Sequence, residues 1–173
     1  MERDLFMKTI INIALSISFS LSTGVTQAAL ISSQNNPSNA VGITHIILVE
    51  NAEKAGAITK VIRGGARDCA QVPLEDRTSC VAQVLRDASK TSRKVKFGAN
   101  KTTRALGRAA SKMKRLPDDG SEASFAEGRE IIRDLHKQIL GISKTRPKEY
   151  RRYQIEVAES VLSLLKPLKK GKV

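Results

Sequence analysis

The sequence has no tryptophan and few other aromatic residues, with two tyrosines and four phenylalanines among 173 residues. Aromatic side chains are the platforms on which single-stranded nucleic acids stack, so large binding platforms of that kind are scarce in this chain. Only Phe97, Phe125, Tyr150 and Tyr153 follow the predicted signal peptide described below. A hydrophobic core built from this sequence must therefore be largely aliphatic.

Motifs of the common catalytic and metal-binding classes are also missing. The chain has no G-x-S-x-G, P-loop or G-x-G-x-x-G sequence, and His45 and His136 form no H-x-x-x-H pair. We expect the acidic pairs Glu75-Asp76 and Asp118-Asp119 at turns or helix starts, where acids stabilise the helix dipole. We therefore predict a non-enzymatic protein without catalytic residues, metal site or cofactor. The alternative is a hydrolase whose carboxylates are brought together by the fold, because such pairs leave little trace in a sequence.

The sequence has only two cysteines, Cys69 and Cys80. A structural zinc site needs four Cys or His ligands, and a redox-active pair has C-x-x-C spacing, so neither fits this pair. In an exported chain, a closely spaced pair of this kind is most simply a disulfide. We predict a Cys69–Cys80 disulfide that stabilises the fold by roughly 3 kcal/mol in the chain-entropy model.

The first thirty residues have the order of parts found in a secretory signal peptide. Lys8 supplies a positive charge, and within the stretch from Thr9 to Val25 an apolar region of isoleucine and leucine, with Ala14 and Phe19, runs from Ile10 to Leu21. Small residues follow, and Thr26-Gln27-Ala28 forms an A-x-A-like cleavage site before Ala29. We therefore predict that residues 1–28 are a cleaved signal peptide and that the protein is periplasmic or secreted.

Two details refine the signal prediction. Glu2 and Asp4 are unusual so early in a signal, so we expect translation to start at Met7 and cleavage to follow Ala28 or Ala29. A retained membrane anchor is the competing interpretation. Such an anchor needs about 20 predominantly apolar residues, whereas serines interrupt this run.

Charge is strongly one-sided. Thirty lysine and arginine residues against 17 aspartate and glutamate residues give a formal net charge of +13. Residues 1–28 contain two charges of each sign, so cleavage would leave that value unchanged. A surface this basic attracts polyanions such as nucleic acid, anionic lipid, lipopolysaccharide or acidic glycans. The alternative is a well-solvated basic protein with no such partner.

The segment that begins at Ile43 fits either a strand or a helix. Its β-branched residues suit a short strand near 43–49, but apolar residues continue at helical spacing at Ile47, Ala55, Ile58 and Ile62. We favour a helix that ends before Gly64-Gly65. With the strand, the fold would be α+β.

Four further helices are predicted from apolar stripes and helix-end residues. The second opens at Pro73, and the third runs from Asn100 or Thr102 to Leu116. The fourth begins with a capping box, Ser124-Phe125-Ala126-Glu127, and stops at Gly141. The fifth starts near Pro147 and ends at Lys166-Pro167.

Together these segments predict an all-α protein, a small helical bundle of about four to five helices. After the signal peptide we expect a flexible arm at 29–42, a helical domain at 43–166 and a basic tail at 167–173. About 145 residues would remain after cleavage, which is the size of one domain.

The stretch from Arg86 to Arg115, which we call the basic band, is the most informative feature for function. Asp87 is its only acid. If the second and third helices pack antiparallel, its charges could form one patch. The candidate anion-binding residues are Arg86, Lys90, Arg93, Lys101, Arg104, Arg108, Lys112 and Arg115. A charged face that is merely solvated remains the alternative.

We therefore expect an exported, basic, non-enzymatic protein that binds an anionic envelope component or polyanion, with anionic lipid and lipopolysaccharide as candidate partners. Nucleic acid is disfavoured by the export signal and by the scarcity of stacking aromatics. The alternative is a protein–protein accessory factor that uses an apolar helix face, for which the Tyr150–Leu165 stripe is the candidate.

Overall fold

The computed structural model describes residues 37–169, with side chains described for residues 49–97 and 100–169. This part contains five α-helices and three short 3-10 helices, with no strand. The helices are α1 (Pro37–Cys69), η1 (Leu74–Asp76), α2 (Arg77–Lys94), η2 (Phe97–Asn100), α3 (Lys101–Met113), α4 (Glu122–Lys144), α5 (Lys148–Val161) and η3 (Leu162–Leu165). The all-α prediction is confirmed, and the alternative strand near 43–49 is wrong because that segment belongs to α1. The predicted signal peptide lies outside the described residues.

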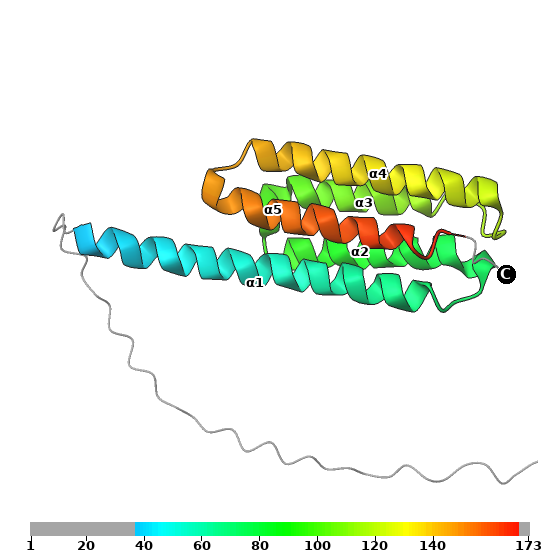
Figure 1. The fold of residues 1–173 in the computed structure, drawn as a ribbon, viewed down its shortest axis with the longest axis horizontal. Coiled ribbons are helices and arrows are strands. Elements are labelled where there is room, and N and C mark those ends of the chain that lie inside the picture. The colour runs from blue at the N-terminus through cyan, green and yellow to red at the C-terminus, as the bar shows by residue number, and fades with distance from the viewer. Residues whose placement is uncertain (1–36, 170–173) are drawn as a thin grey trace, which may run out of the picture. The chain divides into compact units, whose positions relative to one another are not determined.

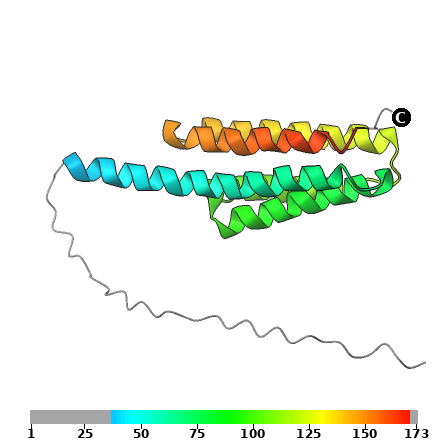
Figure 2. The same ribbon diagram turned by 60° about the horizontal axis from the view of Figure 1, so that its bottom comes forward.

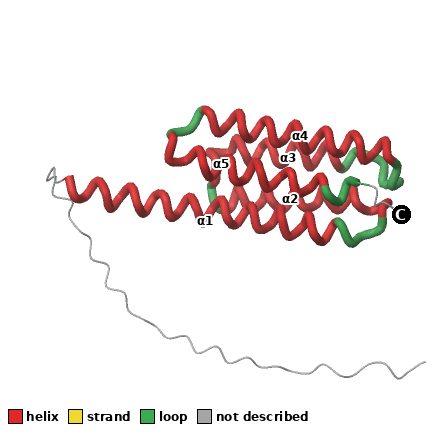
Figure 3. Tube along the Cα trace, in the orientation of Figure 1, coloured by secondary structure: helices red, strands yellow, loops and turns green. Residues whose placement is uncertain are grey.

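The five α-helices form a ring in which each packs against its neighbours in sequence and α5 returns to pack against α1 (Figure 1). Figure 2 shows the same bundle after a rotation, and in both views the N-terminal part of α1 extends past the N-terminal end of α5. At 1.5 Å per residue, the 33 residues of α1 are about 50 Å long. The loops that connect successive helices from α2 through α5 lie at the two ends of the bundle (Figure 3).

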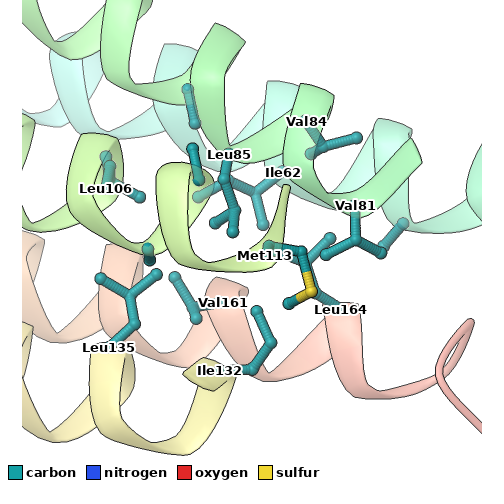
Figure 4. Close-up of a cluster of buried hydrophobic side chains, with 14 of the residues drawn as sticks. Ile62, Val81, Val84, Leu85, Leu106, Met113, Ile132, Leu135, Val161 and Leu164 are labelled. Atoms are coloured by element: carbon teal, nitrogen blue, oxygen red, sulfur yellow. The ribbon is translucent and has the colours of Figure 1, made fainter. Parts of the chain in front are cut away.

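The core is aliphatic, as the composition predicts. Phe125 is the one aromatic residue among the largest fully buried side chains described. The others are Ile58, Ile62, Val81, Leu85, Leu106, Met113, Ile132, Leu135, Ile139, Leu164 and Leu168. Figure 4 shows part of this cluster, to which all five helices contribute. These side chains come from the apolar stripes of the helices, so the helical periodicity in the sequence indicates which residues are buried.

The helix predicted to end before Gly64-Gly65 in fact continues to Cys69. A Cβ atom built on Gly65 would lie 2.3 Å from Val84 Cγ2 in α2, whereas one on Gly64 would meet nothing within 4 Å. The glycine at 65 therefore permits close packing of α1 on α2 and does not end the helix. The predicted stop was wrong because a glycine pair alone does not distinguish these two roles.

The predicted disulfide is confirmed, with a Cα–Cα distance of 5.6 Å between Cys69 and Cys80. Cys69 is the last residue of α1, not part of the connection, and its side chain is fully buried. Pro73 precedes the short helix η1, so α2 begins later than predicted, at Arg77. The disulfide therefore joins the end of α1 to the first turns of α2.

The predicted helix boundaries of α4 are wrong at both ends. Its N-cap is Ser121, whose Oγ accepts a hydrogen bond from the backbone N–H of Ser124 at 3.1 Å. The predicted capping serine, Ser124, instead donates from its Oγ to Asp119 Oδ1 at 2.9 Å. Gly141 lies inside α4, which continues to Lys144. The fifth helix begins where predicted, with Pro147 as the residue before its first turn.

The boundaries predicted for the arm and the tail also need correction. α1 begins at Pro37, inside the predicted arm at 29–42, and the rest of that arm lies outside the described residues. At the other end, Leu168 is fully buried. Arg77 Nη1 donates to the carbonyl of Pro167 at 3.3 Å, and Arg129 Nη1 donates to that of Leu168 at 2.7 Å. Residues 167–169 are therefore packed on the bundle, while 170–173 lie outside the described residues.

Candidate functional site

The two helices that carry the basic band, α2 and α3, pack closely along a polar seam. Ser89 Oγ donates to the Thr103 carbonyl at 2.9 Å, and Ser92 Oγ lies 2.8 Å from Thr103 Oγ1. A Cβ atom on Gly107 would be 3.4 Å from Ser89 Oγ. Residues later in α2 thus meet residues early in α3, as an antiparallel pair requires. The seam leaves little room for side chains between the helices, so their long cationic side chains lie outside it.

The two faces of α3 are sharply divided. Its buried face consists of Thr102, Thr103, Ala105, Leu106, Ala109, Ala110 and Met113. Lys101, Arg104, Arg108, Lys112 and, just beyond the helix, Arg115 are all exposed. Steps of three or four residues place these cations along one side of a helix. The small alanines and Gly107 allow α3 to approach its neighbouring helices closely. The cations lie at the exposed edge of these helix–helix contacts.

A groove of about 480 Å³ runs between α2 and α3, and we call it the α2–α3 groove. It is lined by Ser89, Arg93, Thr103, Arg104, Gly107, Arg108, Ser111, Lys112 and Arg115. Five of these residues are cationic, three carry hydroxyl groups, and none is acidic. Within the described residues, none of the five cations forms an ion pair with a carboxylate.

The structure brings together five of the eight predicted anion-binding residues in this groove. Lys101 lies beyond it and lines a second groove, between α3 and α4. Arg86 and Lys90 are exposed on α2 but do not line the α2–α3 groove. The ammonium of Lys90 lies 3.3 Å from Asp87 Oδ1, so the single acid of the basic band is paired with a cation outside the groove.

Acidic residues border α3 on its other side. A groove of about 410 Å³ between α3 and α4 is lined by Lys112 and Arg115 from the α3 side and by Glu127, Glu130 and Asp134 from α4. Lys112 and Arg115 therefore have carboxylates on their α4 side and none in the lining on their α2 side. Arg104 and Arg108, together with Lys101, also line a groove on the α4 side, and the lining of that groove has no carboxylate.

The paired acids Asp118 and Asp119 act at helix starts, in agreement with the sequence-based expectation. Asp118 Oδ1 accepts hydrogen bonds from Thr78 Oγ1 and, at 3.1 Å, from the backbone N–H of Ser79 in the first turn of α2. Asp119 Oδ1 accepts from the backbone N–H of Ser121 at 2.9 Å, which with the Ser121 and Ser124 hydroxyls lowers the pKa of Asp119. Sequence reasoning missed that Asp118 serves a helix 39 residues away.

The apolar stripe of α5 does not offer a free docking face. Tyr153, Val157, Val161 and Leu164 are buried in the core. The large hydrophobic side chains that are exposed among the described residues are Val49, Leu74 and Ile155, and they belong to α1, η1 and α5. Most of the Tyr150–Leu165 stripe therefore packs into the core, and the protein–protein alternative stays a prediction.

Two other kinds of feature are absent from residues 37–169. This part of the chain has no group of three or more His, Cys, Asp or Glu residues able to hold a metal ion. It also has no helix long and apolar enough to cross a membrane. His136 Nε2 lies 3.2 Å from Glu159 Oε1, which joins α4 to α5 at the surface.

Comparisons with protein-family models, curated proteins and solved structures found no match to this chain. Function is therefore inferred from the geometry of the α2–α3 groove.

Proposed function

We propose that this chain is an exported, non-enzymatic binding protein that holds an anionic partner in the α2–α3 groove. The observation that carries the proposal is the convergence of five cations from two helices on one groove whose lining contains no carboxylate. A groove lined by charge of one sign focuses the electrostatic potential and raises the local concentration of oppositely charged partners. Anionic lipid, lipopolysaccharide and other polyanions have the required charge.

The arrangement on α3 is unfavourable without a partner. Arg104 and Arg108, and then Arg108 and Lys112, stand four residues apart on one face of the helix. Like charges at this spacing destabilise a helix by about 0.2–0.5 kcal/mol per pair. A bound anion would offset that repulsion, which supports a role in binding over simple solvation.

Two further features agree with export and with a non-stacking partner. The Cys69–Cys80 disulfide is compatible with an oxidising compartment such as the periplasm or the cell exterior. The groove lining contains no aromatic side chain on which bases could stack. Both features favour an anionic partner of the cell envelope or its surroundings over nucleic acid.

A charge-reversal pair of variants tests the proposal. The groove variant carries Arg104→Glu, Arg108→Glu and Lys112→Glu. The control carries Arg133→Glu, Lys137→Glu and Arg151→Glu, three exposed cations of α4 and α5. Both variants change the net charge equally. Binding to anionic vesicles, lipopolysaccharide and polyphosphate is measured at low ionic strength, with circular dichroism as the check on folding.

We expect the groove variant to lose about tenfold or more in affinity for at least one of these partners, whereas the control stays within about threefold of the wild type. Wild-type binding should also weaken steeply as salt is added, because phosphate contacts release counterions. Equal losses in the two variants would mean that only net charge matters. Unchanged binding in the groove variant would remove the groove from the proposal.

A further inference from the structure

We infer that the occupant of the α2–α3 groove is a single extended polyanionic chain, with anionic groups repeated along its length, that lies parallel to α3. This inference rests on the proposed function, because it assumes that the groove binds anions. It goes further by excluding two other forms of anionic partner, a flat bilayer surface and an isolated small anion.

The spacing of the cations carries the first step. Arg104, Arg108, Lys112 and Arg115 follow one another at intervals of four, four and three residues. At 1.5 Å per residue, adjacent cations are separated by about 4.5–6 Å along the axis and the row is about 16 Å long. A single phosphate could contact only one or two members of such a row. A chain with repeated charges could contact all of them at once.

The opposite wall of the groove adds a fifth charge at one end. Arg93 lines the groove from α2. Because its neighbour Ser92 contacts Thr103, Arg93 lies toward the Arg104 end of the row. The site is therefore longer than it is wide, with cations along one wall and a further cation across from one end. This shape suits a strand laid lengthwise.

The floor of the groove is small and polar. Gly107 contributes no side chain there, and Ser89 lies beneath it. The Ser111 hydroxyl donates to the Gly107 carbonyl at 3.1 Å, so it lies back against the helix. A chain can thus approach the backbone of α3 between flanking cations. A larger residue at position 107 would fill this space without changing any charge.

The groove lacks the apolar contacts that a bilayer needs. A helix that lies on a membrane places large apolar side chains beside its cations, where they enter the acyl region. On α3 the large apolar residues Leu106 and Met113 are fully buried in the bundle. The described exposed hydrophobics, Val49, Leu74 and Ile155, belong to other elements. A flat headgroup surface would therefore meet only the rim of the groove.

Multivalent contact predicts a dependence on chain length. Each added anionic group that reaches another cation binds at a high effective concentration, so affinity rises steeply until the row is covered. Once the chain spans about 16 Å, extra length adds only alternative registers. With about five contacts to a flexible chain, the logarithm of affinity should fall with the logarithm of salt at a slope near −3.5.

The test uses the full chain after signal removal and a series of inorganic phosphates. Orthophosphate, pyrophosphate, tripolyphosphate and polyphosphates of about ten and about fifty units are titrated by calorimetry at low salt. A carboxylate chain, polygalacturonate, shows whether phosphate itself is required. Vesicles with about 30 % anionic lipid, whose negative surface potential attracts basic segments, supply the bilayer arm.

We expect affinity to rise at least about a hundredfold from pyrophosphate to the ten-unit chain and less than about tenfold from ten to fifty units. Tight binding of polygalacturonate would extend the inference to carboxylate chains, and its failure would restrict it to phosphate chains. Gly107→Gln should weaken binding of the ten-unit chain by about tenfold or more, whereas Gly107→Ala stays near the wild type because a Cβ fits there. Folding of both variants is checked by circular dichroism.

Two results would overturn the inference and leave the proposed function intact. One is pyrophosphate binding as tight as that of the ten-unit chain. The other is vesicle binding that exceeds chain binding and is abolished by the triple reversal of Arg104, Arg108 and Lys112. If none of the phosphates, polygalacturonate or vesicles binds the wild type better than it binds this triple variant, the proposed function itself fails.

Discussion

Gly65 of α1 and Val84 of α2 are so close that a Cβ atom on the glycine would lie 2.3 Å from one methyl carbon of the valine and 2.8 Å from the other. A Cβ atom on the preceding residue, Gly64, would have no other atom within 4 Å. Two adjacent glycines in one helix therefore have different roles. Gly65 sets the distance between α1 and α2, while Gly64 makes no contact that requires a glycine.

Substitution of the two glycines should change stability in opposite directions. Gly65→Ala forces α1 and α2 apart and should lower the free energy of unfolding by about 1–3 kcal/mol. Gly64→Ala should raise it by about 0.5–1 kcal/mol, because alanine favours a helix more than glycine does. Urea denaturation measures both. Val84→Ala should recover part of the loss in the Gly65→Ala background, and a purely additive double variant would argue against the contact.

Removal of the Asp118 carboxylate should destabilise α2 from a distance. Asp118→Ala leaves the backbone N–H of Ser79 without its acceptor and should lower the free energy of unfolding by about 1 kcal/mol. Glu156→Ala, at an exposed position of α5, is the control and should have an effect within about 0.5 kcal/mol. Equal effects of the two substitutions in thermal unfolding would show that Asp118 does not cap α2.

Acid should destabilise the start of α4 through Asp119. The backbone N–H of Ser121, and then the Ser121 and Ser124 hydroxyls, lower the pKa of Asp119 below its ordinary value of 3.8. A group whose pKa is lower in the folded state contributes stability that is fully present above the unfolded value and is lost as pH falls through the folded value. Stability should therefore fall below about pH 4, and Asp119→Asn should make that fall shallower. NMR titration of the Asp119 carboxyl in the folded protein, if it gave a value at or above 3.8, would contradict this.

Two buried threonines should respond oppositely to replacement by valine. Among the described residues, Thr59 has a buried hydroxyl with no hydrogen-bond partner, whereas Thr102 Oγ1 donates to Gln154 Oε1 at 3.1 Å. Thr59→Val should raise the free energy of unfolding by about 1 kcal/mol, because the unpaired hydroxyl is removed. Thr102→Val should lower it by about 1–2 kcal/mol, because the Gln154 oxygen loses its donor. Losses of similar size at both sites in chemical denaturation would contradict the assignment of Thr59 as unpaired.

Patterns confined to one helix were predictable from the sequence. The apolar spacing of Leu135 and Ile139, or of Val157 and Val161, depends only on the helical period and indicates burial on one face. The row of cations on α3 follows from the same period. Arg93 lines the same groove as these cations because of how α2 packs on α3, and the helical period within one segment does not determine that packing.

Features that depend on distant partners were not predictable in the same way. The serine at 124 begins an S-x-x-E pattern, yet Ser121 is the cap because Asp119 engages Ser124. Likewise, the sequence near Gly65 contains no sign of Val84, and the sequence near Asp118 contains no sign of Ser79. In each case the contact that decides the residue's role is made by a side chain outside the local sequence pattern. The local pattern alone was therefore compatible with more than one role.

The hydrogen bonds from Arg77 to the C-terminal end of the bundle limit the order in which contacts can form during synthesis. Its guanidinium donates to carbonyl groups that lie 90 and 92 residues further along the chain. The start of α2 therefore reaches its final set of contacts only after α5 and residues 167–169 have left the ribosome. Until then, Leu168 cannot occupy its buried position beside Gly128 and Met113. The contacts at this end of the bundle therefore form last, after nearly all of the described chain has been synthesised.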